Sequence, residues 1–235
     1  RRRTQNAGGC MIVAIHQPEY LPWLGLLDKA KRADLFVFLD HVQFNRASLQ
    51  HRARIIGQAG PEWLTIPFVH RFPQRIDEVA VADGLWPERH AEAIRVAYGR
   101  APSFDDVAPW LDAFFAIKSE RVADAAIESM RLLFNAFGVA TATVRSSGLD
   151  VPGAKSALVL GICQRLGATR YLCGPTAAKH YLDHDAFAAA GIAVDVQEFA
   201  FPDYDGAPAV DGWRHGLSAL DAWMYLGDRA KGLLS

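Results

Sequence analysis

Cysteine is scarce in this 235-residue sequence, which contains only Cys10, Cys163 and Cys173. Their wide spacing forms no CxxC pair, and no histidine stands at zinc-ligand spacing from them. This excludes a disulfide framework and the zinc sites built on paired cysteines. Because separated cysteines in odd number are typical of free thiols in a reducing compartment, we expect no metal site and a cytoplasmic location.

The sequence also lacks an excess of charge of one sign and any long hydrophobic run. The formal net charge is -1, which gives no global electrostatic reason to expect nucleic-acid or membrane partners. No apolar stretch approaches the roughly 20 residues that cross a bilayer. Residues 1–10 have no apolar core, so they do not form a secretory signal. We expect a disordered or cloning-derived tail over 1–10 and a single domain over 11–235.

What the sequence does contain is an alternation of strand and helix patterns. Apolar runs at 11–15, 33–40 and 170–173 predict buried strands, and a strand, a crossover helix and a second buried strand favour parallel pairing. We therefore predict the α/β class with a mostly parallel open sheet. The block at about 86–137 has helical spacing and predicts a helical insertion or subdomain. Further strands are expected at 63–69, 77–82, 142–149 and 192–199, and a solvated loop at 46–54.

The most informative stretch is I-H-Q-P-E-Y-L-P-W-L-G, at the C-terminal end of the first predicted strand. In open α/β sheets, ligands bind at the carboxyl ends of strands. His16 can act there as a general base, and Gln17 can bind a polar substrate group. Tyr20 and Trp23 are candidates for a wall of the binding site. The alternatives are a histidine that only holds the turn and aromatic residues of an ordinary core.

The second predicted strand also ends in polar residues. An unpaired carboxylate is unfavourable at the end of a buried strand, so Asp40 needs a partner such as His16 or Arg46. Asp40 is expected to orient His16, and capping of the following turn is the alternative. Gln43 and Asn45 can bind a substrate amide or hydroxyl, and Arg46 can meet a phosphate or carboxylate.

A third strand end carries Cys173, followed by Gly174. A catalytic thiol needs a lowered pKa, and nothing in the sequence directs a histidine toward Cys173, so a buried small residue is the main interpretation. We expect one crevice at the ends of the strands that finish at Ile15, Leu39 and Leu172, with residues 86–137 forming one wall.

The motifs H-Q-P-E-Y-L-P-W-L-G, F-L-D-H-V-Q-F-N-R, W-L-T-I-P and Y-L-C-G-P occur in order along nearly the whole chain, and they resemble the WbqC-like family. Members of that family tend to belong to surface-polysaccharide and natural-product pathways and are described as amino-acid (glycine) or acyl transferases. This chain lacks the arginine and the histidine that the family usually has at Ala157 and Phe201, which removes a common anion contact. It also has Cys173 in place of serine and His51 in place of asparagine. The motif positions that carry over are His16, Gln17, Tyr20, Trp23, Asp40, Gln43, Tyr171, Gly174, Tyr181, Asp183, Gln197, Tyr204, Ser218 and Asp221.

We therefore expect an amide-forming acyl or aminoacyl (glycyl) transferase, with a carrier-protein thioester as donor and an amine or amino sugar as acceptor. His16 and Asp40 are the expected catalytic residues, and no cofactor is expected. The first strand, loop and helix also resemble the nucleotidyltransferase-like fold, which leaves nucleotidyl or adenylyl transfer as an alternative. The H-x-G-H signature of that fold is absent. A non-catalytic ligand-binding protein is the third interpretation.

Overall fold

Five parallel strands form the central sheet of this computed structural model, which describes residues 9–57, 60–205 and 216–234. The strand order is β7-β2-β1-β8-β9, and Val13 pairs with Leu35 on one side and with Tyr171 on the other. The predicted α/β class with a parallel open sheet is confirmed. The strands are β1 (Ile12–His16), β2 (Leu35–Phe38), β7 (Ala142–Arg145), β8 (Arg170–Cys173) and β9 (Ala193–Val196).

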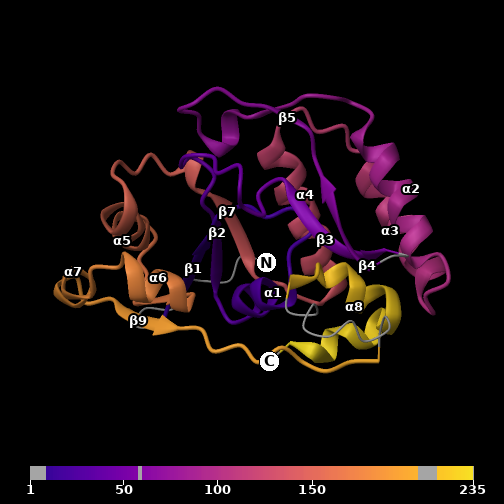
Figure 1. The fold of residues 1–235 in the computed structure, drawn as a ribbon. Helices are drawn as coiled ribbons and strands as arrows, with labels where there is room; N and C mark the ends of the chain where they lie inside the picture. Colours follow the sequence, from indigo (N-terminus) through magenta and orange to yellow (C-terminus); the bar gives the residue numbers. More distant parts are fainter. Residues whose placement is uncertain (1–8, 58–59, 206–215, 235) are drawn as a thin grey trace, which may run out of the picture.

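The sheet separates two apolar cores, because successive residues of a strand point to opposite faces. In β2, Phe36 and Phe38 belong to the larger core, whereas Val37 belongs to the smaller one. The larger core includes helices α1 (Leu24–Lys31), α4 (Val122–Ala136) and α8 (Ala219–Leu226). The smaller core includes α5 (Lys155–Arg165) and α7 (His184–Ala189), which lie with α6 (Pro175–His180) on the opposite side (Figure 1).

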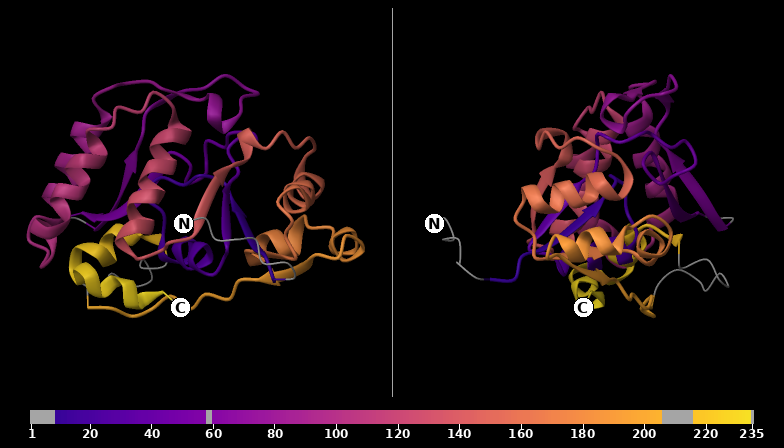
Figure 2. Two further views of the ribbon diagram at one scale, coloured as in Figure 1. Left: turned by 180° about the vertical axis from the view of Figure 1, so that it is seen from behind. Right: turned by 90° about the vertical axis from the view of Figure 1, so that its left-hand side faces the viewer.

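The predicted helical block is present as α2 (Trp86–Tyr98), α3 (Phe104–Phe115) and α4. Helix α2 packs against the antiparallel hairpin of β3 (Arg52–Gly57) and β4 (Gly60–Thr65). Helices α2 and α3 lie at the end of the molecule that is remote from α5, α6 and α7 (Figure 2). This arrangement determines which helices can reach the carboxyl ends of the sheet strands.

The segment 46–54, expected to be a loop, contains the start of strand β3. The guanidinium groups of Arg52 and Arg54 lie 4.5 and 4.7 Å from the ring centre of Trp63, which pairs with Arg54 across the hairpin. A cross-strand aromatic partner stabilises arginine in a strand, and local sequence does not show that partner.

Several predicted strands are shorter than expected: those at 142–149 and 192–199 are present as β7 and β9, and two others differ more. The strand predicted at 63–69 is divided, because β4 ends at Thr65 and a separate short strand, β5 (Phe68–Val69), follows Pro67. The segment 77–82 begins in the 3-10 turn η1 (Ile76–Glu78) and forms only β6 (Ala80–Val81), which pairs with β5. Proline interrupts a strand because it has no backbone N–H to donate.

Two further expectations concern the ends of the chain and the membrane. The predicted tail at 1–10 falls mainly on residues 1–8, which lie outside the described residues. In the described ranges, no helix is long and apolar enough to cross a bilayer.

Candidate functional site

A cavity of about 970 Å³ lies at the carboxyl ends of the sheet strands. Strand order reverses here, because β1 lies between β2, the next strand in the chain, and β8, a much later one. Ligands of open α/β proteins bind at such a reversal. The expected crevice is therefore present at this edge of the sheet. Each neighbouring strand end contributes to the lining, with Ile15, His16 and Gln17 from β1, Leu39 from β2, Gly174 from β8 and Gln197 from β9.

The walls of this cavity come from helices α1, α5 and α6. The expected wall from residues 86–137 is wrong, since none of the lining residues lies in that block. The block packs instead on the face of the sheet that carries Phe36 and Phe38, and on the β3–β4 hairpin. Helix α1 and its N-cap contribute Trp23, Gly25, Leu26 and Lys29. Helix α5 contributes Lys155, Leu158 and Val159, and helix α6 contributes Pro175, Thr176 and Ala177.

The ionisable lining of the cavity is basic. Lys29 and Lys155 line it, and none of its described lining residues is a carboxylate. Nowhere in the described ranges do three or more His, Cys, Asp or Glu side chains gather as a metal site. Opposite charges attract strongly in a partly enclosed cavity, so this lining favours a ligand that carries an anionic group.

His16 is the last residue of β1 and presents one unprotonated ring nitrogen. Its Nδ1 lies 2.9 Å from the carbonyl oxygen of Gln17, which can only accept a hydrogen bond. Nδ1 therefore carries the hydrogen in the neutral ring, and the lone pair is on Nε2. Burial, and after it the positive charge of Lys29, lower the pKa of His16 from 6.5 to about 3. At neutral pH the ring is uncharged, and the lone pair of Nε2 can accept a hydrogen bond.

Lys29 is a site residue that sequence reasoning missed. Its side chain is 3% exposed, and Nζ donates a hydrogen bond to the carbonyl oxygen of Ile15 at 2.8 Å. Burial lowers the pKa of Lys29 from 10.5 to about 8, although Cys173 and Glu19, in their ionised forms, act in the opposite direction. The one available signal was the pair Asp28-Lys29 inside a short helix that is apolar on both sides.

Glu19 is the second ionisable group that sequence reasoning missed. Burial raises its pKa from 4.5 to about 8, against the attraction of Lys29, so the carboxyl is mainly protonated at neutral pH. Oε1 lies 3.9 Å from Nδ1 of His16, and Oε2 is buried with no hydrogen-bond partner in the described part of the chain. A carboxyl group with a raised pKa makes the free energy of unfolding depend on pH.

The variant Glu19→Gln is expected to gain stability relative to the wild type as pH rises. Since the folded-state pKa is raised, the stabilising contribution of Glu19 is complete below about pH 4.5 and is lost as pH rises through about 8. Glutamine has a similar shape and does not titrate. Urea unfolding at pH 5 and pH 9 should show the difference in unfolding free energy growing by an amount on the order of a few kcal/mol. A difference independent of pH would contradict the raised pKa.

The loop between β1 and α1 is held in a strained conformation. Leu21 has φ 41°, a left-handed value that costs a side chain such as leucine about 1–2 kcal/mol. Its backbone N–H donates to Oγ of Ser129 on α4 at 2.8 Å, which helps to fix the turn. A Cβ atom on Gly25 would lie 2.2 Å from the Trp23 ring, so glycine is required for the indole to lie over α1 as a cavity wall.

Eight of the predicted site residues line the cavity. Gln17 accepts a hydrogen bond at Oε1 from Gln50 at 2.7 Å, which leaves its Nε2 group free to donate to a ligand. Gln197 donates to the carbonyl oxygen of Gly25 and to Oδ2 of Asp28, so it joins the end of β9 to α1. The eight residues are His16, Gln17, Trp23, Gln43, Tyr171, Gly174, Tyr181 and Gln197.

Asp40 does not contact His16, although the sequence predicted this pair. Its carboxylate accepts hydrogen bonds from Nε of Arg145 at 2.6 Å, from the backbone N–H of Ser147 at 2.9 Å and from Oγ of Ser146 at 3.1 Å. Burial acts to raise the pKa of Asp40, but the hydrogen bonds and the charge of Arg145 outweigh it, and the pKa is lower than 3.8. Through these hydrogen bonds Asp40 links the end of β2 to the turn after β7, so its role is structural.

Tyr20, Tyr204 and Asp221 also lie outside the cavity lining, within the larger core. The hydroxyl of Tyr20 is 2.8 Å from Nδ1 of His90, because the loop after β1 turns this ring toward α2. The hydroxyl of Tyr204 donates to Asp221 at 2.7 Å, and that of Tyr98 donates to the other oxygen at 3.0 Å. The polar groups of these motif residues are therefore hydrogen-bonded within the core.

The other predicted binding residues have local structural roles outside the lining. Asn45 bonds within its own turn, and Arg46 lies 5.9 Å from the ring centre of Phe68. Asp183 caps the N-terminus of α7. Cys173 is fully buried and burial raises the pKa of its thiol, which makes it a poor nucleophile.

Comparison with known proteins gives one family and one relative. The model of the WbqC-like protein family matches residues 17–232, which include four of the five sheet strands, most of the residues that line the cavity, and the helical block; strand β1, with Ile15 and His16, precedes the matched range. The uncharacterized protein Rv1507c of Mycobacterium tuberculosis is 29% identical over 228 residues, which cover 93% of this chain and 95% of that protein. No solved structure matches the chain.

Proposed function

The chain belongs to the WbqC-like protein family, and on that premise we propose that it is a transferase that forms an amide. An acyl or aminoacyl group, glycyl among them, moves from a carrier-protein thioester to an amine or amino sugar in surface-polysaccharide or natural-product biosynthesis. One observation carries the proposal: the unprotonated nitrogen of His16 and the ammonium group of Lys29 line a single cavity that has no carboxylate among its described lining residues.

The proposed reaction needs one group that accepts a proton and then returns it. The amine nitrogen attacks the thioester carbonyl carbon, a C–N bond forms, and the π electrons move to oxygen. Nε2 of His16 accepts the proton that the nitrogen releases. When the carbonyl re-forms, the C–S bond breaks and the leaving sulfur takes the proton from His16. The products are an amide and a free thiol.

Hydrogen-bond donors in the cavity support this reaction, because its intermediate carries negative charge on oxygen. Lys29 uses one N–H group on Ile15 and retains two, and Gln17 retains its Nε2 group. An anionic substrate group beside Lys29 also offsets the charge that Lys29 exerts on His16. The pKa of His16 then rises toward the range of an effective base.

The experiment that tests the proposal is a transfer assay. The protein is incubated with carrier-protein thioesters of labelled acyl and aminoacyl groups and with a panel of amines and amino sugars. Mass spectrometry then separates amide from free acid. Amide that forms only with the protein supports the proposal, whereas label recovered solely as free acid indicates thioester hydrolysis and contradicts it.

Nucleotidyl or adenylyl transfer is the second candidate function. The observation in its favour is the pair Lys29 and Lys155 in a cavity at the strand-order reversal, where phosphate groups bind in other open α/β proteins. It predicts Mg²⁺-dependent binding of ATP, CTP or a nucleotide sugar with release of pyrophosphate. Calorimetry that shows no nucleotide binding at millimolar concentration would remove this candidate. Ligand binding without turnover would favour the third, non-catalytic interpretation.

The substrate affinity is expected to fall as pH rises through about 8, because Lys29 loses its positive charge there. In Lys29→Met the affinity at pH 7 should be roughly 10-fold weaker, the loss of one charged hydrogen bond. That variant should show no further loss above pH 8. Lys31→Met, on the exposed side of the same helix, is the matched control and should keep the wild-type profile. KM from pH 6 to 9.5 is the measurement, and a wild-type profile in Lys29→Met would rule out this role.

A further inference from the structure

A second cavity of about 660 Å³ lies between α3, α4 and the C-terminal helices, and it shares no lining residue with the cavity at the strand ends. Its C-terminal wall combines α8 with the 3-10 helix η4 (Gly227–Leu233). The proposed transferase reaction uses none of its residues.

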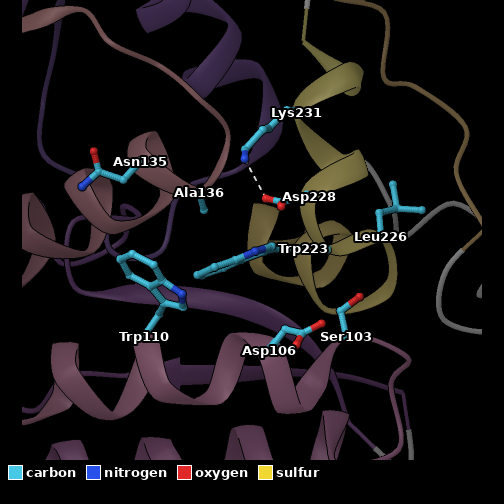
Figure 3. Close-up of a pocket in the computed structure, with 10 residues that line it drawn as sticks. Ser103, Asp106, Trp110, Asn135, Ala136, Trp223, Leu226, Asp228 and Lys231 are labelled. Atoms are coloured by element: carbon cyan, nitrogen blue, oxygen red, sulfur yellow. Dashed lines mark hydrogen bonds and ion pairs between the residues drawn. The ribbon is translucent and has the colours of Figure 1, made fainter.

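Two tryptophan side chains border this second cavity. Trp110 comes from α3 and is 56% exposed, whereas Trp223 comes from α8 and is 6% exposed. Figure 3 shows both indole groups at the cavity, with Asp106 and Ser103 nearby on the α3 side and Asp228 on the C-terminal helices. An exposed tryptophan beside a concave, partly polar surface is typical of a binding site.

Among the described residues, the charges around the tryptophans leave one carboxylate without a cation. Asp228 is paired with Nζ of Lys231 at 2.6 Å. Asp106 has no ion pair or hydrogen bond with any residue of the described ranges. It lies in the first turn of α3. With two carboxylates and one ammonium group, the ionisable lining of this cavity has a charge of -1.

We propose that this second cavity binds a small organic ammonium ion. A cation over the face of an indole ring is attracted by the negative potential of that face, and tryptophan is the best aromatic residue for this contact. Asp106 supplies the opposite charge, while the hydrocarbon part of the ligand covers the apolar surface of Trp110. This site is independent of the amide-forming reaction, since it requires neither His16 nor Lys29.

Choline and its uncharged isostere 3,3-dimethylbutan-1-ol are suitable probes, because they differ in charge but hardly in shape. Calorimetry with the full chain should show choline binding at least about 10-fold tighter than the isostere. Trp110→Ala should weaken choline binding by about 10-fold or more and Trp110→Phe by less, because phenylalanine keeps an aromatic face. Asp106→Asn should weaken it by about 5-fold, and the effect should decrease in high salt.

The matched control is Trp63→Ala, which removes another exposed tryptophan, far from this cavity in the sequence and outside its lining. It should leave choline affinity unchanged. The proposal is overturned if choline does not bind at about 10 mM. It is also overturned if choline and its isostere bind equally, or if Trp110→Ala has no effect. Binding of glucose with the same dependence on Trp110 would identify a saccharide platform and reject the ammonium ligand.

Discussion

Replacing His16 with alanine is expected to lower kcat/KM for amide formation by roughly 10²- to 10⁴-fold, the usual contribution of a positioned general base. The variant loses the unprotonated nitrogen at the cavity while the surrounding sheet remains intact, since His16 is at the end of β1 and partly exposed within the cavity. The measurement is the initial rate of transfer at several substrate concentrations. Wild-type kcat/KM in His16→Ala, on a substrate that the protein turns over, would reject the catalytic role.

The matched control is His180→Ala, an exposed histidine on α6 that does not line the cavity. Thermal unfolding of both variants separates a loss of fold from a loss of chemistry. The pH dependence adds a second readout, because kcat/KM reports the free enzyme and kcat the substrate complex. With the pKa of free His16 at about 3, kcat/KM calculated on the concentration of unprotonated amine should stay level from pH 7 to pH 5. A fall centred near pH 6.5 would mean that the ring has its ordinary pKa.

The variant Asp40→Asn is expected to lower the unfolding free energy by about 3 kcal/mol, because it leaves the partly buried guanidinium of Arg145 without its buried partner. The pKa of Asp40 is lowered in the folded protein, so the contribution is present above about pH 4 and is lost as pH falls through the folded-state pKa. Urea unfolding at pH 7 and pH 3 measures both effects. The difference between variant and wild type should shrink in acid.

Asp124→Asn is the matched control, because Asp124 is the other carboxylate bound to Arg145 and is 41% exposed. An exposed ion pair contributes less than about 1 kcal/mol, so this variant should be nearly neutral. Below its unfolding temperature, Asp40→Asn should retain the transfer rate, since Asp40 lies outside the cavity lining. If the Asp40→Asn protein is folded but has lost its transfer activity, the result would support the role that the sequence predicted for Asp40, which is to orient His16.

The strands of the central sheet, the helical block and the edge of the sheet that forms the cavity could be predicted from the sequence alone. Continuous apolar runs such as Leu35–Phe38 bury both faces, which is the pattern of a parallel strand. The carboxyl ends of parallel strands meet at one edge, so polar residues that directly follow them, such as His16 and Gln17, could be assigned to a common site. These properties depend on local pattern and on connection rules.

The side-chain partners and the ionisation of the site were decided only by the tertiary structure. Asp40 bonds with Arg145, which is 105 residues away, and no local signal distinguishes that partner from His16. The proton on Nδ1 of His16 follows from the position of one carbonyl group, and the lowered pKa of Lys29 follows from burial by several elements. Burial is a property of the whole packed chain, because it depends on segments that are distant in the sequence. The sequence therefore determined where the candidate site lies, and packing determined the charge and the hydrogen-bonding state of its groups.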